Sequence, residues 1–161
     1  MPDAPNPIAG KPGSRLRKLG LVLPMPPTPL GPYVEVNQVG SLLFLSGTLP
    51  IVDGKLAFTG RLGENLSTEQ GREAARLAAL NALALVQEHL GDLDRVKKLV
   101  KLTVLMVTTA QFLEQVTVSD GASNVFVPLF GPELGHVRVV VGVQSLPVGA
   151  PVLVETIFEV G

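Results

Sequence analysis

A regular pattern of small apolar positions in the middle of the chain predicts a long helix. The segment Ser67–Gln70 has the form of a capping box, with a serine hydroxyl at the N-cap and a glutamine three positions later. Gly91 is a natural stop, because glycine readily takes the left-handed conformation that ends many helices. We therefore predict a helix from Ser67 to about Leu90 that can lie close against a sheet. Its apolar face is Ala75, Ala78, Ala79, Ala82 and Val86.

Alternating and β-branched runs predict strands on both sides of this helix. In Val96–Thr108, every second residue from Val100 to Met106 is apolar, so these residues share one strand face. Asp53-Gly54 is a strong signal for a tight hairpin turn. The predicted strands are Tyr33–Val39, Ser41–Ser46, Leu49–Val52, Lys55–Phe58, Val96–Thr108, Val137–Val143 and Val152–Val160. We expect the last two, joined by residues 144–151, to form a C-terminal hairpin.

A second helix is predicted within Ala110–Phe130. Its polar insert, Thr117–Asn124, contains Asp120-Gly121, and there we expect a break into a loop and a shorter helix. The order of elements is then hairpin strands, helix, strand, helix and two strands. This order favours an α+β domain with its helices on one face of a sheet.

The first 14 residues are rich in proline and glycine and lack the apolar stretch of a signal peptide. We interpret 1–14 as a flexible leader and 15–161 as one domain, since the chain shows no internal repeat. Pro24–Pro32 is a proline-rich linker that should be extended. With no such signal and no cysteine, the cytoplasm is the expected compartment.

Composition indicates more apolar surface than one small core can hold. Apolar residues make up 46% of the chain and charged residues only 17%, and the mean hydropathy is +0.38. A membrane span needs about 20 apolar residues, but Leu77–Val86 is interrupted by Asn81 and Val137–Val143 by Arg138. We therefore expect some apolar residues to be buried between subunits of a homo-oligomer.

Charge and motifs exclude several classes of function. The net charge is -1, with one tyrosine and no tryptophan, which argues against a nucleic-acid binder. Phosphate-binding glycine loops, Cys-x-x-Cys and His-Glu-x-x-His patterns are absent. The two histidines, His89 and His136, are far apart in sequence, so we expect no metal site, and no cofactor motif is present.

An arginine within a run of valines is the main candidate for chemistry. Arg138 lies in Val137–Val143, where a buried charge is costly unless it is paired. One interpretation is a structural ion pair with a glutamate on the next strand. The other is a guanidinium that binds a substrate carboxylate through two hydrogen bonds. The residues alone leave both interpretations open.

Several short motifs together resemble the reactive-intermediate deaminases, the RidA-like or YjgF-like family. The resemblance spans roughly Arg15 to Val160. It rests on Gly31-Pro32-Tyr33, Ser46-Gly47, the Leu66–Gly91 helix, and the spacing from Arg138 to Leu146-Pro147. One subgroup of the family is indicated by Leu19–Pro24, by Gly71 with Ala74-Ala75-Arg76, and by Asp120–Ser123.

The resemblance implies a chorismate-mutase-like α+β fold, with a mixed sheet, two helices on one face and a homotrimer built around a central barrel. It implies hydrolysis of 2-imino or enamine acids to 2-keto acids and ammonia, in clefts between subunits, without metal or cofactor. Arg138 would hold the substrate carboxylate, and Tyr33 would line the cleft. The other implied cleft residues are Ser46, Gly47, Ser123, Asn124 and Phe130. His136 would either donate to the ligand or lie at the surface.

One position departs from the family pattern. The family usually has a glutamate on the last strand that helps to place the attacking water, and Leu153 stands there. Glu155, two residues on, points to the same strand face and would either replace that carboxylate as a catalytic group or neutralise Arg138. The alternative function is therefore a small-carboxylate binding or regulatory protein without catalysis. An endoribonuclease, an activity of some family members, is the third possibility.

Overall fold

The computed structural model describes residues 9–161. Residues 1–8 of the predicted leader lie outside the described residues. A short helix, α1 (Pro12–Lys18), begins inside the segment predicted to be flexible, with proline at one of its first positions. The backbone N–H of Gly13 donates to Asp94 Oδ1 at 2.8 Å. The last residues of the predicted leader are therefore helical and attached to the domain.

The predicted central helix is confirmed as α2 (Thr68–Leu90). Ser67 is the N-cap, and its hydroxyl accepts from the Gln70 N–H at 3.1 Å while the Gln70 side chain accepts from the Ser67 N–H at 2.9 Å. Gly91 ends the helix in the left-handed conformation, with φ of 76°. The predicted alanine face is buried. Local signals were therefore sufficient to define this element.

The main sheet has five strands in the order β1 (Val36–Val39), β2 (Leu42–Leu45), β7 (Val152–Val160), β5 (Val96–Val107) and β6 (Val137–Val143). A separate small hairpin pairs β3 (Ile51–Val52) with β4 (Lys55–Leu56) around the predicted Asp53-Gly54 turn. The sheet is mixed, because β6 runs parallel to β5 while the other pairs are antiparallel. Short 3₁₀ turns are η1 (Leu93–Arg95), η2 (Pro132–Leu134) and η3 (Pro147–Gly149).

The predicted C-terminal hairpin is wrong, because β5 lies between β6 and β7. β5 is the longest strand, and its central place gives its backbone groups partners on both edges. The segment β5–α3–β6 is a parallel crossover unit in which a helix returns the chain to the start of the next strand. Residues 144–151, including η3, then carry the chain past the end of β5, where Val107 N–H donates to Pro151 O at 2.8 Å.

The predicted break in the second helix is also wrong. α3 (Gln115–Phe130) continues through Asp120-Gly121. A Cβ at Gly121 would lie against the carbonyl oxygen of Arg72 in α2, with the carbonyl carbon at 2.8 Å. Gly121 is therefore a point of close approach between two helices, and the glycine that resembles a turn signal in the sequence serves packing instead.

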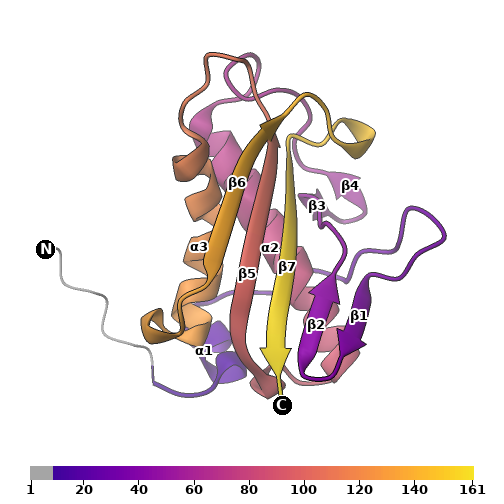
Figure 1. Cartoon of the computed structure of the whole chain (residues 1–161), viewed down its shortest axis with the longest axis vertical. Coiled ribbons are helices and arrows are strands. Elements are labelled where there is room, and N and C mark those ends of the chain that lie inside the picture. Colours follow the sequence, from indigo (N-terminus) through magenta and orange to yellow (C-terminus); the bar gives the residue numbers. More distant parts are fainter. Residues whose placement is uncertain (1–8) are drawn as a thin grey trace, which may run out of the picture.

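Both long helices cover one face of the sheet and leave the other open, as Figure 1 shows. Leu102, Val104 and Met106 of β5 point toward the helices and are fully buried. On the open face, Val137 and Val139 are 64% and 44% exposed. The predicted α+β architecture with helices on one face is confirmed. Among residues 9–161, no helix is long and apolar enough to cross a membrane.

Candidate functional site

Arg138 is held at one nitrogen by two side chains of α3. Its Nη1 donates to Asp120 Oδ1 at 2.8 Å and to Ser123 Oγ at 3.1 Å. Asp120 and Ser123 are three positions apart, so they lie on the same helix face. The Arg138 side chain is 23% exposed, and its Nε and Nη2 have no partner among residues 9–161. One edge of the guanidinium is thus free to bind an acceptor such as a carboxylate.

The charged partner of Arg138 differs from the one that the sequence suggested. An ion pair exists, but with Asp120 of α3 rather than with a strand glutamate. Glu155 is exposed on the open face of the sheet, because its neighbours Val154 and Thr156 are buried against the helices. Within one chain, Glu155 and Arg138 therefore point to opposite sides, and Glu155 does not neutralise this arginine. The sequence did carry one signal for Asp120 as the partner of Arg138: its spacing of three positions from Ser123 places both side chains on the same face of a helix.

His136 joins the same cluster through the serine. Its Nε2 lies 2.9 Å from Ser123 Oγ. Burial lowers the pKa of His136 below its usual value, and the positive charge of Arg138 lowers it further. Ser123 Oγ accepts from Arg138 Nη1, so its own hydrogen remains available to His136 Nε2 in the tautomer that carries the ring hydrogen on Nδ1. The structure thus connects Asp120, Arg138, Ser123 and His136.

Three other predicted residues lie at the opposite edge of the sheet. Tyr33 precedes β1, and its hydroxyl accepts from the Leu30 N–H at 3.1 Å. Ser46 follows β2, and its hydroxyl donates to Val34 O at 2.9 Å. A Cβ at Gly47 would lie 2.6 to 2.8 Å from the Leu153 side chain, so this leucine lies directly over the glycine. A single chain therefore does not bring these residues to Arg138.

The last two predicted residues have other surroundings. Asn124 is next to Ser123 but exposed. Phe130 is buried, with its ring centroid 6.5 Å from Phe126 and 6.0 Å from Phe158. These three rings pack together in the core, so Phe130 supports the helix that presents Asp120 and Ser123.

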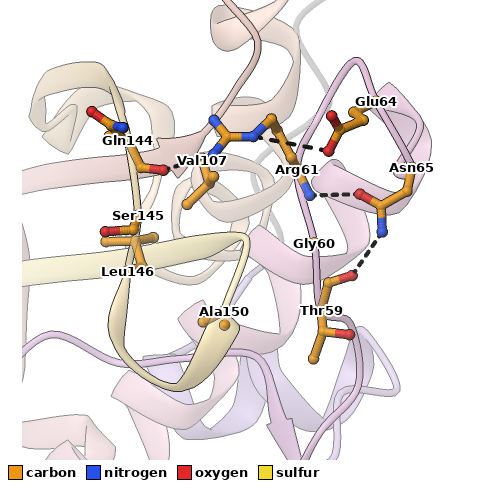
Figure 2. Close-up of a pocket in the computed structure, with 11 residues that line it drawn as sticks. Thr59, Gly60, Arg61, Glu64, Asn65, Val107, Gln144, Ser145, Leu146 and Ala150 are labelled. Carbon is orange, nitrogen blue, oxygen red and sulfur yellow. Dashed lines mark hydrogen bonds and ion pairs between the residues drawn. The ribbon is translucent and has the colours of Figure 1, made fainter.

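A pocket of about 490 Å³ lies at the other end of β6 from Arg138 and is shown in Figure 2. Arg61 crosses it, with Nη1 donating to Thr108 O at 2.8 Å and Nη2 to Gln144 O at 3.0 Å. Asn65 accepts from the Arg61 N–H at 2.8 Å. Both terminal nitrogens of Arg61 donate to backbone carbonyls, so this arginine links the loop between β4 and α2 to the ends of β5 and β6.

A second pocket, of about 420 Å³, is lined by Tyr33 and the proline-rich segment. Glu35, Glu88 and His89 also line it. Burial raises the pKa of Glu35 above its usual value. This pocket was not predicted as a unit, because its residues come from an extended segment and from the far end of α2. Among residues 9–161, no group of three His, Asp or Glu side chains is arranged to hold a metal ion.

Comparison with known proteins places this geometry in a family. The family described as "YjgF/chorismate mutase-like, putative endoribonuclease" matches residues 13–160. Protein TCP17 of Trypanosoma cruzi is 41% identical over 94% of this chain and 95% of its own length. The crystal structure of "a putative endoribonuclease from Shewanella oneidensis MR-1" is 34% identical, covers 94% of this chain and 100% of that one, and superposes with a TM-score of 0.89. The chain therefore belongs to the RidA/YjgF-like family.

A more distant structure shares the fold. E. coli TdcF, solved with bound serine, is 21% identical over 86% of this chain and 94% of its own, with a TM-score of 0.61. The predicted family resemblance and the YjgF-like fold are thus confirmed.

Proposed function

We propose that this protein hydrolyses small 2-imino or enamine acids to 2-keto acids and ammonia, in a cleft formed between copies of the chain. The observation that carries the proposal is the free guanidinium edge of Arg138, whose other edge is fixed by Asp120 and Ser123. A carboxylate accepting from Nε and Nη2 would form a bidentate pair, the strongest hydrogen-bonded arrangement for these groups. We also propose that the protein acts in the cytoplasm, the compartment expected from the sequence.

Two copies are needed because the expected cleft residues lie at opposite edges of the sheet. Arg138 is on β6, one edge strand of the sheet, while Ser46 and Gly47 follow β2, next to the opposite edge strand β1 (Figure 1). A head-to-tail contact, in which the β6 edge of one chain meets the β1–β2 edge of the next, would bring them together. Such a contact forms a ring when the rotation between neighbouring copies closes, and we propose that it closes as the trimer of the family. The apolar open face would then be buried inside the ring.

The chemistry requires orientation more than a cofactor. Arg138 would fix the substrate carboxylate, which is one bond from the imine carbon, and so present that carbon to water. Positive charge beside the site also favours a ligand that carries a carboxylate. The serine bound to TdcF is a small amino acid of this type, which supports the proposed substrate class.

The test is imine hydrolysis with matched arginine variants. An amino-acid oxidase generates 2-iminobutanoate in the cuvette, and semicarbazide traps what the protein has not hydrolysed. We expect the wild type to suppress trapping and Arg138→Ala to lose this effect. Arg76→Ala is the control, because Arg76 is a partly exposed arginine on α2 that pairs with Glu73. Equal trapping with and without wild-type protein, across several imino acids, would exclude the proposed reaction.

A non-catalytic carboxylate-binding protein is the second candidate, and Leu153 favours it. This leucine occupies the position of the usual glutamate and covers Gly47, while Glu155 points to the open face. Titration calorimetry with 2-ketobutanoate separates the two functions. Binding that Arg138→Ala abolishes, without any imine hydrolysis by the wild type, would establish this second function in place of the first.

A further inference from the structure

Ser123 and His136 form a hydrogen-bonded pair directly beside the proposed carboxylate site. Ser123 Oγ lies 3.1 Å from Arg138 Nη1 and 2.9 Å from His136 Nε2. The serine is 9% exposed and the histidine is half-buried. Ser123 is on α3 and His136 directly precedes β6, and only the tertiary fold brings the two together.

With the ring hydrogen of His136 on Nδ1, this pair is a path for a proton. Arg138 has only donors, so Ser123 Oγ accepts from it, and in this tautomer the serine donates its own hydrogen to His136 Nε2. When Ser123 Oγ takes up a proton from water, its own hydroxyl hydrogen can therefore move to the imidazole without any rotation of the side chains. A neutral imidazole in such a position is suited to take and return a proton.

The hydrolysis proposed above lacks an obvious base, since Leu153 carries no charge at the position where the family usually has a glutamate. We propose that His136, acting through the Ser123 hydroxyl, holds the proton that water releases and returns it to the departing nitrogen. This inference rests on the proposed function. Arg138 would remain the substrate-binding group, Ser123 the relay and His136 the positioning and proton-holding residue.

The step balances without a co-reactant. Water attacks the carbon of the protonated imine, a C–O bond forms, and the C=N π pair moves to nitrogen. The water proton passes to Ser123 Oγ while the serine hydrogen moves to His136 Nε2. The imidazolium then returns a proton through Ser123 to the amine of the carbinolamine. The C–N bond breaks with its pair going to nitrogen, the C=O bond forms, and the hydroxyl proton leaves with ammonia as ammonium.

The charges near His136 are consistent with a neutral resting imidazole. Arg138, two residues on, lowers the pKa of His136, and burial lowers it more. Asp120 of α3 bonds to Arg138 rather than to the imidazole. Other charged groups on adjoining elements include Glu133 in η2, three residues before the histidine, and Lys101 of β5, which pairs with the exposed Val137. The rate should therefore fall as the pH falls through the lowered pKa, because the protonated imidazole can no longer accept.

The test compares pH profiles of imine hydrolysis in His136→Gln, Ser123→Ala and Ser123→Thr. Glutamine retains an acceptor for the serine hydroxyl but cannot take a proton, so a merely structural role would survive the change. We expect kcat to fall about 100-fold or more in His136→Gln, the lower range for general acid–base catalysis, with the acidic limb of the profile lost and KM little changed. Ser123→Ala should show the same loss, and Ser123→Thr should restore most of the rate.

Three results would overturn the inference. If His136→Gln retains kcat within threefold or keeps the acidic limb, the imidazole does not hold the proton, although the hydrolase function stands. If His136→Gln does not fold, the serine variants decide, and equal rates in Ser123→Ala and wild type exclude the relay. If the wild type hydrolyses no imino acid at any pH, the proposed function fails and this inference fails with it.

Discussion

Gly121 is the position where one added methyl group should disturb both the fold and the site. In α3 it lies against the backbone of Arg72 in α2, and a Cβ there would come within 3.0 Å of Arg72 Cα as well as against the carbonyl. Real Cβ atoms essentially never lie so close. Because the neighbour is main chain, a change of rotamer does not relieve the overlap, and α3 has to move away from α2. Asp120 and Ser123, which hold Arg138, would move with it.

The size of the effect follows from two opposing contributions. Overpacking of a filled interior costs about 1 to 3 kcal/mol, and a backbone neighbour places Gly121→Ala at the upper end. Alanine in place of glycine inside a helix returns about 1 kcal/mol. We therefore expect a net loss of about 2 kcal/mol. For a domain of this size that corresponds to a decrease in Tm of about 4 to 8 °C.

The assay is thermal and urea unfolding at one fixed protein concentration, because the stability of an oligomer depends on concentration. Gly71→Ala is the matched control: it is also a helical glycine, but its Cβ would meet side-chain atoms of Leu62 at 2.8 Å and Val118 at 3.0 Å, which have more freedom to adjust. We expect a clearly smaller loss for the control. If Gly121→Ala is no less stable than Gly71→Ala, close helix approach is not the reason for this glycine.

Three further predictions concern stability and activity. The unfolded chain binds a proton on His136 at about pH 6.5, whereas the folded chain does so only at lower pH. Folding stability should therefore fall as the pH falls from about 6.5 through the lowered pKa. The free energy of unfolding in urea, measured for wild type and for His136→Gln, should differ by an amount that changes with pH in this way. Glu35, whose raised pKa has the opposite effect on stability, is present in both proteins and cancels in the difference. Gly47→Ala should cost about 1 kcal/mol by crowding Leu153, and a double-mutant cycle with Leu153→Ala should recover it; purely additive losses would contradict this contact. Leu153→Glu should raise the rate of imine hydrolysis at least about tenfold by supplying a carboxylate base, and an unchanged kcat would show that a carboxylate at this position gives no help.

Prediction from sequence succeeded where the signal was local. The capping box at Ser67, the left-handed stop at Gly91 and the hairpin turn after Val52 are all set by residues within a few positions of one another. It failed at Gly121, because an Asp-Gly pair can form a turn or lie at a close contact between helices, and the local sequence does not distinguish the two. It also missed Asp120 as the partner of Arg138, since the fold decides which element lies over a strand.

The sequence by itself determined the two-faced character of the strands, the long helix and an arginine that needs a partner. Hydrogen bonds and side-chain periodicity over a few residues are sufficient for these features. Only the tertiary structure decided that β5 lies between β6 and β7, that Glu155 faces away from Arg138, and that Ser123 and His136 meet. These depend on pairing between distant segments, where the burial of the whole core selects one arrangement among several that are equally compatible with the local pattern.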